Sequence, residues 1–139
     1  MIEIFVDANF FIALFYSKDS LHKRAITISK KLKKESIQLV ISNLIFAEVV
    51  TVISQRVSRD IAIHAGQEIF KNPAVRMVYI DEYLHNLSWQ IFQEISKKDM
   101  SFVDCSILGV MRAEGIQKLL TFDREDFSPL TRHYSLELF

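Results

Sequence analysis

Four acidic residues, spread along the whole chain, lie within or directly after apolar segments. Several carboxylates at one buried site are costly, because burial and mutual repulsion both disfavour their charged forms. Hard divalent cations relieve that cost and prefer oxygen ligands. The pattern therefore predicts one cation-binding pocket, formed by the acids of the segments IFVD, LIFAEVV, SFVDCSIL and LLTFD: Asp7, Glu48, Asp104 and Asp123.

Each acid also has a purely structural explanation. Asp7 follows a predicted strand and can cap the helix after it. Ser101 and Asp104 have the spacing of a capping box, in which the acid reaches back to the cap residue. Asp123 lies in a loop, where acids are ordinary, and Asp126 is a nearby substitute for it. Only the joint pattern of all four acids favours a cation site.

Glu48 is the acid that is hardest to explain structurally. It shares a helical face with Leu44 and Val52, so we expect its side chain to be buried. An unpaired buried glutamate would have a strongly raised pKa. The alternative to a cation site is a buried salt bridge to an arginine.

The ligand types define the chemistry that such a pocket could perform. The chain has one cysteine, Cys105, so it has neither a disulfide framework nor a cysteine-based zinc site. Carboxylates alone suit Mg²⁺ or Mn²⁺ better than Zn²⁺. Two such ions about 4 Å apart can activate water and stabilise an in-line phosphoryl displacement.

The composition predicts one globular domain over residues 1–139. Half of the chain is hydrophobic, and the 17 basic and 17 acidic residues cancel. Nucleic-acid binding would therefore need a local basic patch. The amino terminus has no basic leader, and no apolar run approaches the ~20 residues that span a bilayer. We expect a soluble, cytoplasmic protein.

Short apolar strands alternate with helices along the chain. The predicted strands are Ile2–Val6, Gln38–Ile41, Val75–Ile80 and Lys118–Thr121, with a last short strand around His133–Ser135. The first predicted helix is Ala8–Tyr16, and the second is capped by Asp19 and turns Leu21, Ala25, Ile28 and Leu32 inward. A third runs from Ser42 or Asn43 to about Val57. The remaining predicted helices are Ser58–Phe70, Asp81–Lys98, and Val103–Ala113, which Gly115 closes.

This order predicts an α/β fold with a parallel sheet that is covered on both faces. Ligands of such sheets bind at the carboxyl ends of the strands. Asp7 and Asp123 follow strands, whereas Glu48 and Asp104 lie in early turns of helices. We therefore expect the four acids to meet at one edge of the sheet.

The motifs around these acids resemble those of PIN-domain nucleases, above all the VapC-type toxins of toxin–antitoxin pairs. The resemblance spans almost the whole chain and is carried by IFVDAN, NLIFAEV, DMSFVDC and LTFDREDF. It implies a PIN-like three-layer α/β/α fold with a short, mainly parallel central sheet of four to five strands. It also implies a Mg²⁺- or Mn²⁺-dependent endoribonuclease that hydrolyses RNA phosphodiester bonds.

The same resemblance assigns roles to individual residues. Asp7, Glu48, Asp104 and Asp123 would form the metal site, and Asn9 and Ser101 would be supporting polar groups. Asp7 and Asp104 would be the main ligands, and Glu48 would orient the attacking water or take its proton.

Two residues near these motifs, Ala8 and His22, are not assigned to the site. Ala8 stands where many members carry a hydroxyl residue. We expect His22 to be a surface histidine.

Three partners follow from the same reading. A basic helix face could hold the RNA backbone, although a solvated face is the commoner meaning of such a run. The apolar stretches Val49–Val57 and Ile61–Phe70 predict a homodimer, with packing in the core as the alternative. The family also implies a cognate antitoxin that inserts a segment near the acids. The basic residues in question are Lys23, Arg24, Lys30, Lys31, Lys33 and Lys34.

Other classes of protein with acidic pockets fit less well. A receiver domain needs an acid pair after the first strand, and a dehalogenase-type phosphatase needs Asp-x-Asp, but Asn9 interrupts that motif. The stronger alternative is a catalytically silent PIN-like module that only binds RNA or protein. Four mutually repelling carboxylates argue against it.

Overall fold

The computed structural model describes all residues, 1–139, as one five-stranded sheet with helices on both of its faces. The strands are β1 (Glu3–Val6), β2 (Gln38–Ser42), β3 (Val75–Val78), β4 (Lys118–Leu120) and β5 (Glu137–Leu138). They are ordered β3-β2-β1-β4-β5, and every neighbouring pair is parallel. The α/β class and the parallel sheet expected from the sequence are confirmed.

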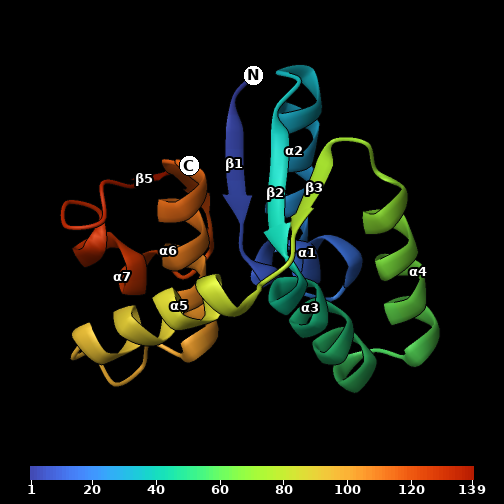
Figure 1. Ribbon diagram of the computed structural model, residues 1–139. Coiled ribbons are helices and arrows are strands. Elements are labelled where there is room, and N and C mark those ends of the chain that lie inside the picture. Colours follow the sequence, from blue (N-terminus) through green and yellow to red (C-terminus); the bar gives the residue numbers. More distant parts are fainter.

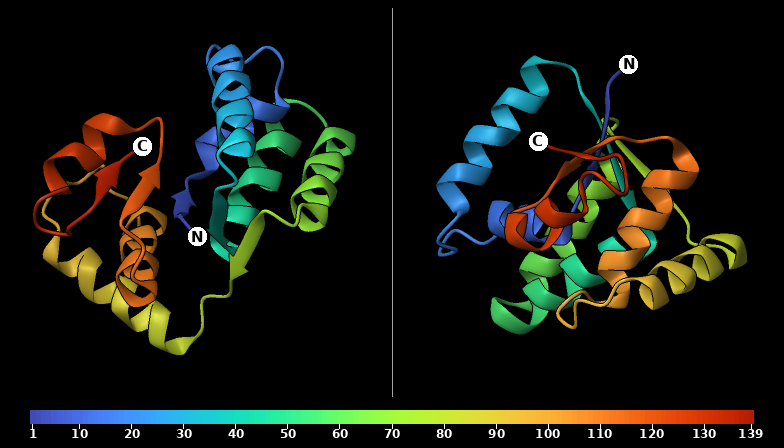
Figure 2. Two further views of the ribbon diagram at one scale, coloured as in Figure 1. Left: turned by 90° about the horizontal axis from the view of Figure 1, so that it is seen from above. Right: turned by 90° about the vertical axis from the view of Figure 1, so that its left-hand side faces the viewer.

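The helices form the two outer layers. They are α1 (Ala8–Phe15), α2 (His22–Lys34), α3 (Asn43–Arg56), α4 (Arg59–Lys71), α5 (Glu82–Glu94), α6 (Phe102–Glu114) and the short α7 (Arg124–Phe127), which a 3₁₀ turn over Ser128–Leu130 follows. Seen along the strands, α1 to α4 lie on one side of the sheet, and α5 and α6 lie on the other (Figure 2).

The central strands are buried because both faces of the sheet are covered. Side chains of β1, β2 and β4 join a core of 31 buried residues, and Phe5 is paired with Val40 on one side and Leu119 on the other. This explains why these strands are continuous apolar runs without alternation. No helix is long and apolar enough to cross a membrane.

The carboxyl ends of β1 and β2 point toward the starts of α1 and α3 (Figure 1). The side chains of Asp7 and Ser42 begin these two helices as N-caps. Of the two caps considered for α3, Ser42 is the one used, through a 3.2 Å bond from the Ile45 N–H. Asn43 instead accepts a 2.7 Å hydrogen bond from the Ile80 N–H, which fixes α3 to the chain after β3.

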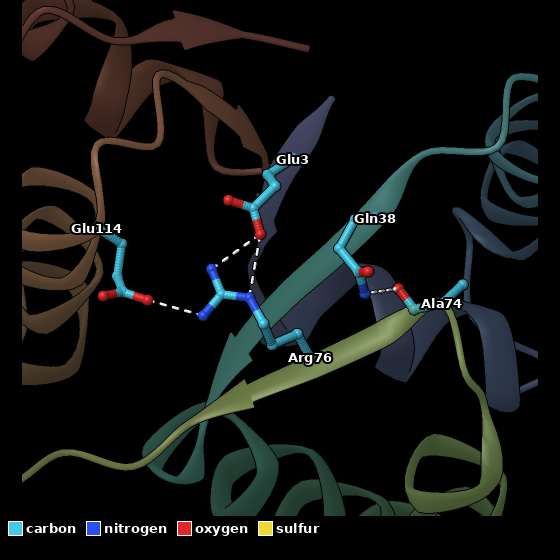
Figure 3. Close-up of polar contacts among 5 residues, drawn as sticks. All are labelled: Glu3, Gln38, Ala74, Arg76 and Glu114. Carbon is cyan, nitrogen blue, oxygen red and sulfur yellow. Dashed lines mark hydrogen bonds and ion pairs between the residues drawn. The ribbon is translucent and has the colours of Figure 1, made fainter. Parts of the chain in front are cut away.

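An ion-pair network joins elements at the opposite, amino-terminal edge of the sheet (Figure 3). The Arg76 guanidinium donates to Glu3 from Nε and Nη2 at 3.0 and 2.8 Å, and to Glu114 from Nη1 at 2.7 Å. Beside it, the Gln38 amide donates to the Ala74 carbonyl oxygen at 2.7 Å. The network links β1, β3 and the end of α6.

Three predicted elements were wrong in detail. Asp19 does not cap α2, which begins after Leu21 without a side-chain cap; the Asp19 carboxylate accepts the Leu21 N–H at 2.8 Å instead. The expected strand at His133–Ser135 is a turn, with Ser135 at φ 54°, and the last strand is Glu137–Leu138. The expected helix Asp81–Lys98 ends at Glu94. Beyond it the chain turns away, and Lys97 forms an ion pair with Asp126 at 2.7 Å.

Candidate functional site

The four predicted acids line one cavity of about 270 Å³ at the carboxyl ends of the strands. Asp7 follows β1, Glu48 lies on α3, Asp104 lies in the first turn of α6, and Asp123 lies in the loop after β4. The other lining residues are Ala8, Asn9, Ile12, Val52, Arg56 and Ser101. Four distant segments of the chain thus bring their carboxylates to one place.

Asp7 is the one acid that is fully buried, with 4% of its surface exposed. Its Oδ1 accepts the Ala8 N–H at 2.7 Å, and its Oδ2 accepts the Thr121 hydroxyl at 2.8 Å. The pKa of Asp7 is raised to about 7, chiefly by burial and also by the charges of Asp104 and Asp123, while the two hydrogen bonds lower it. The helix cap expected from the sequence is present, but the Asp7 carboxylate has no basic side chain as an ion-pair partner.

A small polar network holds the loop after β4 against Asp7. The Asn9 side-chain oxygen accepts the Phe122 N–H at 3.1 Å, and the Asn9 amide lies 3.5 Å from Asp7 Oδ2. The Thr121 hydroxyl oxygen accepts the Asp123 N–H at 3.0 Å. Thr121 was not predicted as a site residue. Its position could have indicated this role, because it is a hydroxyl residue directly after a buried strand and two residues before Asp123.

Asp104 is half-buried and forms the predicted capping box with Ser101. Its N–H donates to Ser101 Oγ at 3.1 Å, and its Oδ2 accepts the Ser101 N–H at 3.0 Å. Burial raises the pKa of Asp104, the two bonds to Ser101 lower it, and the charges of Asp123 and Asp126 raise it. Oδ1 has no hydrogen-bond partner and remains available to a ligand.

Glu48 is exposed, so the prediction that it is buried was wrong. The core face of α3 consists of Ile45, Val49 and Ile53, whereas Glu48 and Val52 face the cavity. No salt bridge to an arginine forms. Partial desolvation raises the pKa of Glu48, and the neighbouring carboxylates add to the effect.

The structure distinguishes the two candidates for the fourth acid. Asp123 lines the cavity, is exposed, and its carboxylate accepts no hydrogen bond. Asp126 is absent from the cavity wall and is paired with Lys97. Of the two, Asp123 is therefore the one available to a ligand in the cavity.

Arg56 is the only basic residue in the cavity wall, and the sequence reasoning missed it. It is exposed and forms no ion pair. Glu48, Val52 and Arg56 recur every four residues along α3, and this helical spacing could have identified it.

The basic face of α2 does not line the cavity. Arg24 is the member tied to the loop after β4, with its guanidinium 5.6 Å from the centre of the Phe122 ring. Lys31 instead lies over Phe139, at 5.2 Å. The remaining members, Lys23, Lys30, Lys33 and Lys34, are exposed. His22 is half-buried rather than a simple surface residue, with Nδ1 2.7 Å from the Ala13 carbonyl oxygen.

The donor set fits a hard divalent cation. All four carboxylates line one cavity, and no cysteine or histidine is among the lining residues. In the present side-chain positions no three of these groups converge on a single ion position. A bound cation would therefore require side-chain rotations, and the carboxylates of Glu48 and Asp123 are free of hydrogen bonds that would oppose them.

The fold and this site define the class of the protein. The PIN domain family matches residues 4–131, and the chain belongs to this family. It is 32% identical over 126 residues to the 23S rRNA-specific endonuclease VapC20 of Mycobacterium tuberculosis, covering 90% of this chain and 92% of that one. The predicted resemblance to VapC-type toxins is confirmed.

Solved structures show the same architecture. The crystal structure of M. tuberculosis VapC20, a Sarcin-Ricin loop cleaving toxin, matches with a TM-score of 0.79 and 30% identity over 91% of this chain and 94% of that one. The DNA-bound VapBC of Salmonella typhimurium matches with a TM-score of 0.74 and 14% identity, covering 100% and 98% of the two chains. The second match shows the fold alone.

Proposed function

We propose that this chain, acting as one domain in the cytoplasm, is a Mg²⁺- or Mn²⁺-dependent endoribonuclease and the toxin of a toxin–antitoxin pair. The observation that carries the proposal is that Asp7, Glu48, Asp104 and Asp123 line one cavity and that none of them forms a salt bridge with a basic side chain. Membership of the PIN family and the whole-length similarity to VapC20 support it.

Asp7, Asp104 and Asp123 are the proposed ligands, and Asn9 and Ser101 fix two of them. A divalent cation held there supplies Lewis-acid activation of water and offsets negative charge at the scissile phosphate. The Asp104 carboxylate keeps one oxygen free after closing its capping box. The backbone N–H groups of Ala8 and Ser101 hold the Asp7 and Asp104 carboxylates in place, whereas the unbonded Asp123 carboxylate would rotate to complete a cation site.

Glu48 is the proposed proton acceptor. Its carboxylate is exposed at the cavity and accepts no hydrogen bond, so it can reach the water that attacks the phosphate. Because the pKa of Glu48 is raised, this carboxylate accepts a proton more readily than an ordinary glutamate does.

Arg56 and the start of α2 are the proposed phosphate contacts. Arg56 is a guanidinium donor in the same cavity, where it can bind a phosphate oxygen of the RNA. Lys23 and Arg24 lie in the first turn of α2, and Arg24 contacts the loop that carries Asp123. Lys30, Lys31 and Lys34 lie in later turns of α2 and would contact only a longer RNA.

Two protein partners are also part of the proposal. An antitoxin is suggested by the toxin–antitoxin complexes among the structural relatives, which include a complex from Klebsiella pneumoniae. A homodimer would bury the groove of about 590 Å³ between α3 and α4, where Phe70 is 64% exposed. Light scattering tests the dimer, since Phe70→Lys would then halve the measured mass.

RNA cleavage by the purified protein tests the enzymatic proposal, with ribosomal RNA as the first substrate because VapC20 is an rRNA endonuclease. We expect cleavage with Mg²⁺ or Mn²⁺ and none in chelator. Asp7→Asn and Asp104→Asn should abolish it while circular dichroism shows an intact fold. Metal-dependent cleavage that survives both substitutions would contradict the proposed site.

A further inference from the structure

A row of aromatic side chains extends along the outer face of α5 to the first residue of α6. The rings of His85 and Phe102 are 5.3 Å apart, those of Phe102 and Phe92 are 6.2 Å apart, and those of Phe92 and Trp89 are 5.7 Å apart. The last pair is nearly parallel, with an interplanar angle of 15°. We call these four residues the aromatic row.

The outer end of the row is open to solvent. Trp89 is 51% exposed and Phe92 is 38% exposed, so their ring surfaces can still contact a ligand. On the helix surface Trp89 neighbours Asn86 and Gln93, which are exposed and uncharged. Amide side chains in such positions can hydrogen-bond to base edges, and they do not repel phosphates.

The row adjoins the wall of the acidic cavity at Phe102, which contacts both His85 and Phe92. Phe102 is the first residue of α6, and the residue before it, Ser101, lines the cavity and forms the capping box with Asp104. Nucleotides that flank a phosphodiester bond in the cavity therefore have the aromatic row within reach.

We propose that the aromatic row stacks unpaired bases of the RNA, beside the scissile bond. Base stacking on aromatic side chains is tolerant of sequence and requires bases that are not paired in a helix. The aromatic row would therefore bind unpaired bases and would not bind a continuous duplex. This inference rests on the proposed ribonuclease function and deepens it.

The chemistry of the row favours RNA over a protein partner. The exposed aliphatic residues of the groove between α3 and α4, such as Ile63, are absent here, and Trp89 is flanked by amides instead. The position of the row is the second argument. An RNA strand bound at the four acids leaves the cavity past one of its walls, and the aromatic row adjoins the wall at Ser101.

Trp89 makes the test direct, because it is the only tryptophan of the chain. In chelator, which prevents cleavage, a short oligoadenylate should quench its fluorescence saturably, and an RNA duplex of the same length should not. Phe92→Leu and Trp89→Leu should each weaken oligoadenylate binding about tenfold by anisotropy. Tyr83→Leu is the matched control, an exposed aromatic on α5 outside the row, and should bind like wild type.

The outcomes separate this inference from the proposed function. Quenching with no cleavage in Mg²⁺ or Mn²⁺ would leave the stacking site intact and refute the nuclease. Cleavage with no quenching, and with wild-type binding by Phe92→Leu and Trp89→Leu, would refute the stacking site alone. If both variants keep wild-type RNA binding but reduce the mass measured by light scattering, the row is an interface between two copies and the inference is overturned.

Discussion

The two edges of the sheet carry similar acidic residues in opposite circumstances. At the amino-terminal edge, Glu3 and Glu114 share the guanidinium of Arg76 at 2.7 to 3.0 Å. At the carboxyl-terminal edge, four carboxylates share one cavity, and none forms an ion pair. The charge is compensated within the chain at one edge and left for a ligand at the other.

The two arginines repeat this contrast. Arg76 uses three of its nitrogens on two glutamates, so it has little capacity for a ligand. Arg56 lines the acidic cavity and is in no ion pair. In this cavity the carboxylates are therefore free to bind the proposed cation, and Arg56 is free to bind a phosphate of the proposed substrate.

The largest expected effect compares two acids of the same helix, α6. Asp104→Asn should reduce RNA cleavage by more than about 100-fold, because it removes a proposed cation ligand. Glu114→Gln, which keeps an acceptor for Arg76 at the other edge, should cleave like wild type. Initial rates on the same RNA measure both, and equal losses would erase the functional distinction between the edges.

The next prediction concerns the stability cost of Asp7. Its pKa is raised to about 7, so the folded state binds a proton more strongly than the unfolded state, and folded stability falls as pH rises from about 4 to about 7. Asp7→Asn cannot ionise and should be more stable than wild type by about 1–3 kcal/mol above pH 7 in chelator.

Urea unfolding at about pH 8 and about pH 5 measures this difference. It should shrink toward the lower pH, where wild-type Asp7 is protonated in the folded state. A variant that is less stable than wild type at both pH values would show that the hydrogen bonds of Asp7 outweigh its buried charge.

Arg56 should have a smaller effect that is confined to the substrate. Arg56→Met should raise KM for RNA about tenfold, about 1.4 kcal/mol, through loss of a phosphate contact. Its melting temperature should stay at the wild-type value, because the side chain is exposed and unpaired. An unchanged KM would remove Arg56 from the substrate path.

The smallest effect is expected at Arg76, where substitution should change stability and leave activity unchanged, the reverse of the result expected for Arg56. Arg76→Met should lower the free energy of unfolding by about 0.5–1 kcal/mol, since its partners are partly exposed and solvent screens such pairs. Cleavage should not change. Thermal unfolding and the RNA assay together test this, and a loss of activity without loss of stability would contradict a purely structural role.

Much of the fold was predictable from short-range patterns. Apolar runs such as Ile4–Val6 identified the buried parallel strands, and the capping residues Asp7 and Ser101 marked where helices begin. Parallel strands put their carboxyl ends at one edge, so the meeting of the four acids followed from the topology.

The remaining errors have a common physical origin. Periodicity shows that Glu48 and Val52 share a helix face, but it cannot distinguish a face on the core from a face on a cavity. For this reason Glu48 was taken as buried, and Arg56, on the same face, was missed. The two-residue strand β5 depends on pairing with β4, a long-range contact without a local sequence pattern.

Mn²⁺ binding tests most directly the claim that the carboxyl-terminal edge is the cation site. Calorimetric titration and the melting temperature should show saturable binding to wild type and to Glu3→Gln, because Glu3 lies at the other edge. Asp7→Asn and Asp104→Asn should lose that binding and the rise in melting temperature. Binding of equal strength by all four proteins, or by none of them, would contradict the account.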